Sequence, residues 1–120
     1  MKYTRIYADA AGETHLEDVG PEMKPADHSS MMTEMIAAKG IIFRETSGAQ
    51  YFVDWHNAPR RQFVVNLSGE VEITVSDGET RHFGAGTILL AEDVTGKGHI
   101  SRGVGNSERL SIFVPLADGK

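Results

Sequence analysis

The sequence contains no cysteine, which excludes disulfide cross-links and any chemistry that depends on a thiolate. It has no apolar run long enough to cross a bilayer, and the opening residues MKYTRIYADA lack the apolar core of a secretion signal. We therefore expect a cytoplasmic protein that interacts with no membrane.

Blocks of positive charge are also missing. The 120 residues carry a formal net charge of −5, whereas nucleic-acid binding requires a basic face, so we exclude that class of function. The densest basic spots are Arg60–Arg61 and the pair Lys97 and Arg102, each large enough for one small anion only. Hydrophobic residues make up 40% of the chain, which is enough for one domain with one packed core.

The chain changes in texture near residue 40. Residues 1–40 are irregular and include the stretch GPEMKPADHSSMM, so we predict an N-terminal arm that packs on the rest of the chain or on a partner subunit. Within it, YTRIYA and the region of SMMTEMI each suit a short strand. The run MMTEMIAAK also fits two helical turns before Gly40, and this alternative stays open.

Residues 41–120 contain a series of short strand-like runs separated by turn residues and without helical intervals. The runs are GIIFRE, AQYFVDWH, QFVVNL, EVEITV, TRHF, TILLAE, HISRGV and RLSIFVPL. This spacing predicts an antiparallel sandwich or barrel. Between the fourth and fifth runs, Asp77-Gly78 predicts a tight hairpin turn with positive φ at both central residues.

The run QFVVNL has two different faces. One face is fully apolar (Phe63, Val65 and Leu67), and we expect it to be buried. The other face is mixed (Gln62, Val64 and Asn66), which suits the wall of a polar pocket. Both faces of this strand are therefore expected to be covered.

The stretch FVDWHNAPRRQFVVNLSG reads as a strand, a turn and a second strand. Because side chains alternate along a strand, Phe52, Asp54 and His56 are predicted to share one face. The hairpin brings Gln62 beside them, and His99 begins another strand further along the chain. Two imidazoles with an amide or a carboxylate facing into a barrel predict a metal site.

These residues resemble the two short motifs of the cupin family, whose members are small jelly-roll barrels. In the first motif, His56 stands at the first histidine, Gln62 at the glutamate and Gly69 at the closing glycine. In the second motif, Gly96 and His99 stand at the glycine and the histidine with the family's spacing. The resemblance covers residues 41–116.

Four positions depart from the motifs. Ala58 takes the place of the second histidine, Val94 that of the proline and Gly103 that of the asparagine, while the leading glycine, Gly86, lies two residues too far away. The barrel part of the pattern is therefore kept better than the metal part.

The resemblance implies an all-β fold, a double-stranded β-helix or jelly-roll barrel, with an extended N-terminal arm. It also implies one divalent ion (Zn, Fe, Mn or Ni) on His56, Gln62 and His99. A metal-free pocket is an equal alternative, because a neutral glutamine brings no negative charge to offset a divalent cation.

Three classes of function stay open. In the first, a cupin enzyme converts a small anionic metabolite, and a bound metal polarises the substrate. Without metal, His56 paired with Asp54 acts as general base, and His99 or Lys97 stabilises the developing negative charge.

In the second class, the barrel binds or senses a small anion without catalysis, and the contacts are Gln62, Arg60, Lys97 and Arg102. In the third, the barrel is only a scaffold for subunit contacts. We expect a homodimer, because small barrels leave sheet edges and apolar strand faces that need covering.

Overall fold

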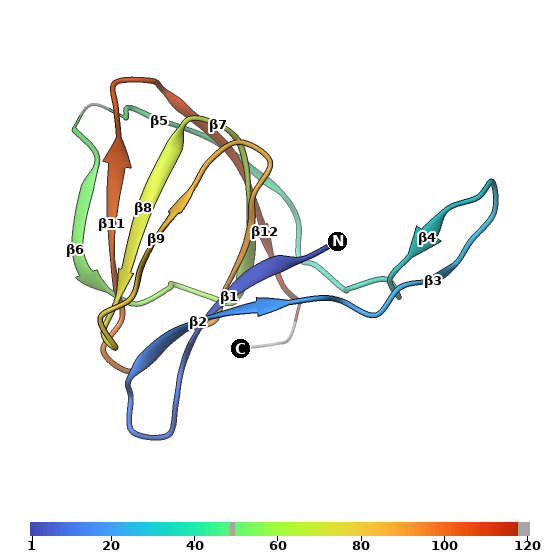
Figure 1. Cartoon of the computed structure of the whole chain (residues 1–120), viewed down its shortest axis with the longest axis horizontal. Helices are drawn as coiled ribbons and strands as arrows, with labels where there is room; N and C mark the ends of the chain where they lie inside the picture. The colour runs from blue at the N-terminus through green and yellow to red at the C-terminus, as the bar shows by residue number, and fades with distance from the viewer. Residues whose placement is uncertain (49, 118–120) are drawn as a thin grey trace.

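The computed structural model describes residues 1–48 and 50–117, and every regular element within them is a β-strand (Figure 1). Six strands form the larger sheet, in the spatial order β2 (Thr14–Val19), β1 (Tyr3–Ala8), β10 (Ile88–Ala91), β7 (Gln62–Ser68), β12 (Arg109–Pro115) and β5 (Ile42–Thr46). Four strands form the smaller sheet, in the order β6 (Phe52–His56), β11 (His99–Val104), β8 (Glu70–Val75) and β9 (Thr80–Phe83). A separate ribbon consists of β3 (Lys24–Pro25) and β4 (Met31–Met32). None of the described segments is a helix with the length and apolarity that crossing a membrane requires.

The two sheets lie face to face, and the hydrophobic core fills the space between them. Because every second side chain of a strand points to the same face, Val71, Ile73 and Val75 of β8 all face inward and are buried. Ile6 and Leu89 meet them from the larger sheet. The all-β prediction is therefore confirmed at the level of a sandwich of two sheets.

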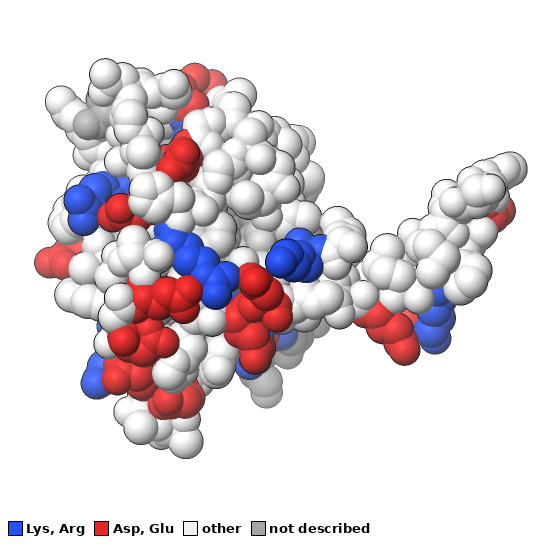
Figure 2. Space-filling model, in the orientation of Figure 1, with Lys and Arg blue, Asp and Glu red and all other residues white. Residues whose placement is uncertain are grey.

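Residues 1–40, which we expected to form one extended arm, contain two different structures. The predicted strand YTRIYA is confirmed as β1, which lies inside the larger sheet between β2 and β10 and runs parallel to β10. Beyond β2 the chain leaves the body, and the β3–β4 ribbon projects from it (Figure 1). The helical alternative for MMTEMIAAK is wrong, since Met31 and Met32 pair with β3. The projecting ribbon carries few charged side chains, and its methionines are exposed (Figure 2).

All eight strand-like runs after residue 40 are strands, β5 to β12. The hairpin predicted at Asp77-Gly78 joins β8 to β9, but only Gly78 has a positive φ, of 100°. Its N–H donates to the carbonyl of Val75 over 3.0 Å, and the Val75 N–H donates to Glu79, also over 3.0 Å. The turn is thus a three-residue loop with glycine in the left-handed position, and the predicted two-residue geometry is wrong.

The two faces of β7 are arranged differently from the prediction. The mixed row faces the core, where Gln62 and Asn66 are buried. The apolar row faces outward, and Leu67 is 52% exposed. Phe43 of β5, on the far side of β12, is 75% exposed. Phe63 and Val65 are half-buried, and Tyr3 packs against the Phe63 ring, so the expected full burial of that row is not met within one chain.

His15 ties β2 to the turn between β8 and β9. Its Nε2 lies 2.8 Å from a carboxylate oxygen of Asp9, and its Nδ1 lies 2.8 Å from one of Asp77. These two hydrogen bonds raise the pKa of His15 above its ordinary value, and the bond to Asp9 has the larger effect. The contact connects the two sheets at their edge and responds to pH.

Candidate functional site

A cavity of about 280 Å³ lies between the two sheets. Its walls are mainly apolar and come from both sheets: Ile6, Val53, Val64, Val71, Ile73, Leu89, Ala91 and Phe113. Polar side chains lie at two separate levels along these walls. His56, His99 and Gln62 lie at one level, and Tyr51, Arg44 and Arg109 lie at the other.

An irregularity in β6 decides which of its residues reach the cavity. His99 of β11 pairs with His56 of β6. Ser101 follows His99 by two positions, but its partner Val53 precedes His56 by three positions. One extra residue of β6 is therefore accommodated near Asp54 and Trp55, as in a β-bulge. Because of it, Val53 and His56 both line the cavity although an odd number of positions separates them.

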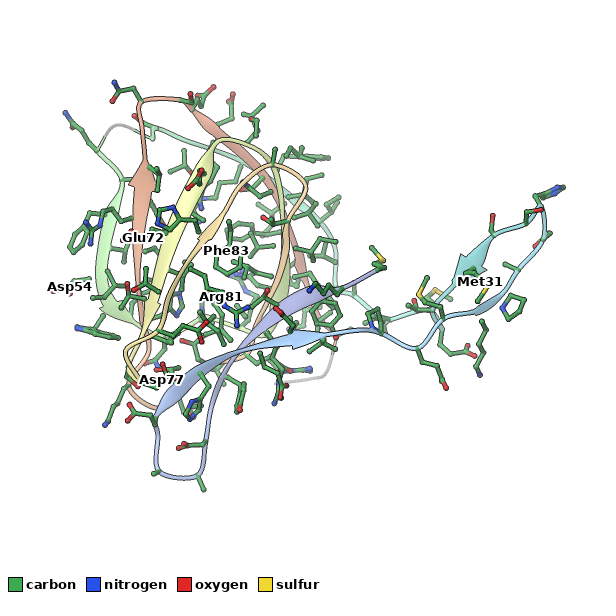
Figure 3. The ribbon with its side chains drawn as sticks, in the orientation of Figure 1. Met31, Asp54, Glu72, Asp77, Arg81 and Phe83 are labelled. Carbon is green, nitrogen blue, oxygen red and sulfur yellow. The ribbon has the colours of Figure 1, made fainter. Side chains whose placement is uncertain are left out.

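The prediction that Phe52, Asp54 and His56 share a face is wrong for this reason. Phe52 and Asp54 are exposed, and Asp54 lies on the outer side of β6, pointing away from the sheets (Figure 3). The Asp54 carboxylate accepts a hydrogen bond from the N–H of Trp55 over 2.9 Å. Asp54 still orients His56, but through its backbone carbonyl, which accepts from Nδ1 of the imidazole over 2.8 Å.

His99 does reach the pocket, and its carboxylate partner is Asp93. Nδ1 of His99 donates to Oδ2 of Asp93 over 2.6 Å, and the two residues are 6% and 0% exposed. The rings of His56 and His99 lie side by side, with centroids 4.3 Å apart and planes inclined by 54°. Nδ1 of each ring is engaged, and Nε2 of each has no hydrogen bond to any described residue. Each imidazole is thereby fixed in orientation with one nitrogen free for another molecule.

The glycines of GKGHISR make this arrangement possible. Gly98 has a φ of +76°, and a Cβ on it would lie 2.3 Å from the carbonyl oxygen of His56. Only glycine therefore lets the start of β11 approach β6 closely enough to stack the imidazoles. The loop is held from the other side, because the N–H of Lys97 donates to the carbonyl of Gly12 over 2.9 Å.

Gln62 is buried on the cavity wall, and Arg60 engages its amide. Nη1 of Arg60 donates to Oε1 of Gln62 over 2.8 Å. That oxygen is the atom a metal would bind, so a cation there would lie beside a guanidinium and find no carboxylate. Among the described residues no group of three histidine, cysteine, aspartate or glutamate side chains is placed to hold a metal ion. The donor set of His56, Gln62 and His99 therefore fits a divalent ion poorly.

The other cations predicted to contact a ligand lie outside the cavity walls. Lys97 is exposed, with its amine 3.5 Å from Glu13. Arg102 is exposed, with its guanidinium 3.3 Å from Glu72. In the Arg60–Arg61 pair, Arg60 reaches the cavity only through Gln62, and Arg61 pairs with Glu92 over 2.6 Å.

The cations that do line the cavity, Arg44 and Arg109, are not predicted from the sequence. Arg109 is 7% exposed, and its guanidinium carbon lies 5.0 Å from the centre of the Tyr51 ring. The guanidinium of Arg44 lies 5.1 Å from the centre of the Phe113 ring. Burial lowers the pKa of Arg109, the charge of Arg44 lowers it further, and contact with Tyr51 acts in the opposite direction.

The site thus combines two oriented imidazoles, apolar walls and two arginines around one space between the sheets. Such a space suits a small organic molecule with polar groups and an apolar body. Comparison of the chain with models of protein families and with curated proteins finds no match.

Proposed function

We propose that this chain is a cupin-like jelly-roll protein that binds a small, anionic organic metabolite between its sheets, with His56 and His99 as polar contacts. One observation carries the proposal: these two residues, matched to the two cupin motifs by spacing, lie with their ring centroids 4.3 Å apart on the wall of a cavity. The two facing sheets, antiparallel except for the pair β1–β10, are also compatible with a jelly roll.

The chemistry of the two imidazoles supports binding of a polar group. Asp93 fixes the proton of His99 on Nδ1, and the Asp54 carbonyl does the same for His56. Each free Nε2 then accepts a hydrogen bond when the ring is neutral and donates one when it is protonated. At about 280 Å³ the cavity lies just below the range for drug-sized ligands, roughly 300–1,000 Å³, which favours a small metabolite.

A library of small organic compounds, neutral and charged, tests this function with histidine-labelled protein. We expect compounds that bind to shift the imidazole NMR signals of His56 and His99 while leaving those of the exposed His28 in place. Ala91→Phe fills the cavity and should abolish these shifts, whereas Ala85→Phe, in an exposed turn, should not. If no compound shifts either imidazole, or if Ala91→Phe binds as well as the wild type, the proposal is wrong.

A second candidate function is proton transfer within the same metabolite, and the Asp93–His99 pair favours it. A buried carboxylate at 2.6 Å from Nδ1 holds the His99 imidazole in the tautomer and orientation that leave Nε2 free to accept a proton. Here Asp93 takes the role that we assigned to Asp54 from the sequence. Deuterium exchange at a carbon of a bound compound in D₂O, lost in His99→Asn with binding retained, would support catalysis. Binding without exchange for every compound would leave a non-catalytic binding protein.

A further inference from the structure

The level of the cavity opposite the histidines contains positive charge without a counter-charge. Arg109 is 7% exposed, and neither Arg109 nor Arg44 forms an ion pair with any carboxylate in residues 1–48 and 50–117. Burying a cation without a partner costs several kcal/mol, and buried arginines in folded proteins are normally paired. An unpaired guanidinium on a cavity wall is therefore placed to meet an anion that comes from outside the chain.

Two buried hydroxyl groups belong to the cross-strand neighbours of these arginines. Arg109 pairs across the sheet with Thr46, and Arg44 pairs with Ser111, so their side chains share the inner face of the larger sheet. The hydroxyl oxygens of Thr46 and Ser111 are buried and have no hydrogen-bond partner in the described chain. Buried polar atoms nearly always have a partner, so the polar groups of this part of the sheet are incompletely satisfied, although neither Thr46 nor Ser111 lines the cavity itself.

The two polar levels of the cavity are well separated. His56 pairs with His99 at one end of β11, while the carbonyl of Tyr51 accepts from the N–H of Gly103 at the other. Gly103 lies four positions after His99 on β11, which corresponds to about 13 Å at ~3.3 Å per residue. Between these levels the wall is mainly apolar, with Val53 and Ile73 on either side of the single hydroxyl group of Ser101. The shape thus suits an elongated molecule that is polar at both ends.

We infer that the ligand is an organic acid whose carboxylate binds to Arg109 and Arg44 and whose other end carries a polar group that reaches His56 and His99. This rests on the proposed function and names the class of its ligand. A guanidinium presents two parallel N–H groups that match the two oxygens of a carboxylate, and Arg44 adds a second charge at the same level. The apolar middle of the cavity selects an aromatic or aliphatic body. The sequence-predicted contacts Arg102 and Lys97 take no part.

Calorimetric titration of the full chain tests this with 3-(4-hydroxyphenyl)propanoate and its primary amide, which differ in charge at one end only. We expect the acid to bind at least about tenfold more tightly than the amide. Arg109→Met should weaken acid binding roughly ten- to a hundredfold and leave amide binding unchanged, as expected for loss of a charged hydrogen bond. Arg44→Met, at an exposed residue, should act in the same direction to a smaller extent. Arg81→Met, a surface arginine on β9, is the matched control and should bind like the wild type.

Phenyl phosphate and inorganic phosphate form a second arm of the titration. Equal affinity for acid and amide, or full acid affinity in both Arg109→Met and Arg44→Met, overturns the carboxylate site. Phenyl phosphate that binds more tightly than the acid and depends on Arg109 overturns the choice of a carboxylate in favour of a phosphate. If the amide shifts the His56 and His99 signals but the arginine substitutions leave the affinity for the acid unchanged, the arginine site fails and the proposed function stands. If no compound in the NMR screen reaches the histidines, both fail.

Discussion

Replacement of Arg109 by methionine should make the unliganded protein more stable. The guanidinium is 7% exposed and has no carboxylate partner among the described residues, so folding removes it from water with no opposite charge to offset the loss. Replacing buried ionic groups by apolar side chains of similar volume is often neutral or stabilises proteins by about 1–4 kcal/mol. The substitution also removes the contact with the Tyr51 ring at 5.0 Å, which contributes about 0.5–1 kcal/mol. The net expectation is a gain of about 1–3 kcal/mol.

Urea denaturation measures this gain, and Trp55, the single tryptophan, reports unfolding by its fluorescence. At about 4 °C per kcal/mol for a domain of this size, the melting temperature should rise by about 4–12 °C. Arg102→Met removes an exposed arginine and should change stability by less than about 0.5 kcal/mol. An Arg109→Met protein that is less stable than the wild type by more than about 1 kcal/mol would refute the reasoning, because it would show that Arg109 is compensated within the fold. The carboxylic acid at about 100 times its wild-type Kd should add ~2.7 kcal/mol to the wild type but only about 0.4–1.4 kcal/mol to Arg109→Met, whose affinity is ten- to a hundredfold lower.

Four other predictions concern single features of the fold. Gly98→Ala places a Cβ 2.3 Å from a carbonyl oxygen and should lower the free energy of unfolding, measured in urea, by more than about 2 kcal/mol. Gly86→Ala, at a glycine with a similar φ but open space around it, should lower it by only about 1 kcal/mol. Equal losses would contradict the close approach of the two strands at Gly98. Because the pKa of His15 is raised by folding, its contribution to stability is complete below about pH 6.5 and is lost as the pH rises through the raised value. The melting temperature of the wild type should therefore fall toward that of His15→Gln between pH 6 and pH 9, whereas the control His28→Gln should behave like the wild type. A difference between wild type and His15→Gln that stays constant over this pH range would contradict the role of His15. Removal of divalent metal with EDTA should leave the melting temperature unchanged, and a fall of several degrees would show that the two imidazoles hold an ion after all. Light scattering should give the mass of a homodimer for the wild type and of a monomer for Phe43→Glu, on the exposed sheet face; a monomeric wild type would end the dimer expectation.

The strands after residue 40 could be predicted because each combines β-branched or aromatic residues with flanking turn residues. β2 was not recognised, since THLEDV directs only Thr14 and Leu16 inward and its remaining side chains, apart from Val19, are polar. Its burial depends on pairing with β1, which is a contact between elements and leaves little trace in local sequence. The wrong assignment of the apolar face of β7 has a related cause, because alternation separates two faces without saying which one a second sheet covers.

The histidine part of the site could also be predicted, since motif spacing led to His56 and His99 and the structure brings their rings together. Asp54 was misplaced because a strict period of two fails where a bulge adds a residue. Arg44 and Arg109 were missed because a charged side chain in a strand is ordinarily read as facing water. Only the pairing of β5 with β12 shows that both lie on the inner face.

The position of β1 has a consequence for how the chain is made. This strand is synthesised well before β10, yet it pairs with it, and Ile6 lies opposite Ala91. On the ribosome, β1 and β2 can therefore form only a two-stranded hairpin, which is marginally stable by itself in water, until β10 has emerged. Because Ile6 forms part of the cavity wall, the binding site is complete only after β1 has joined β10.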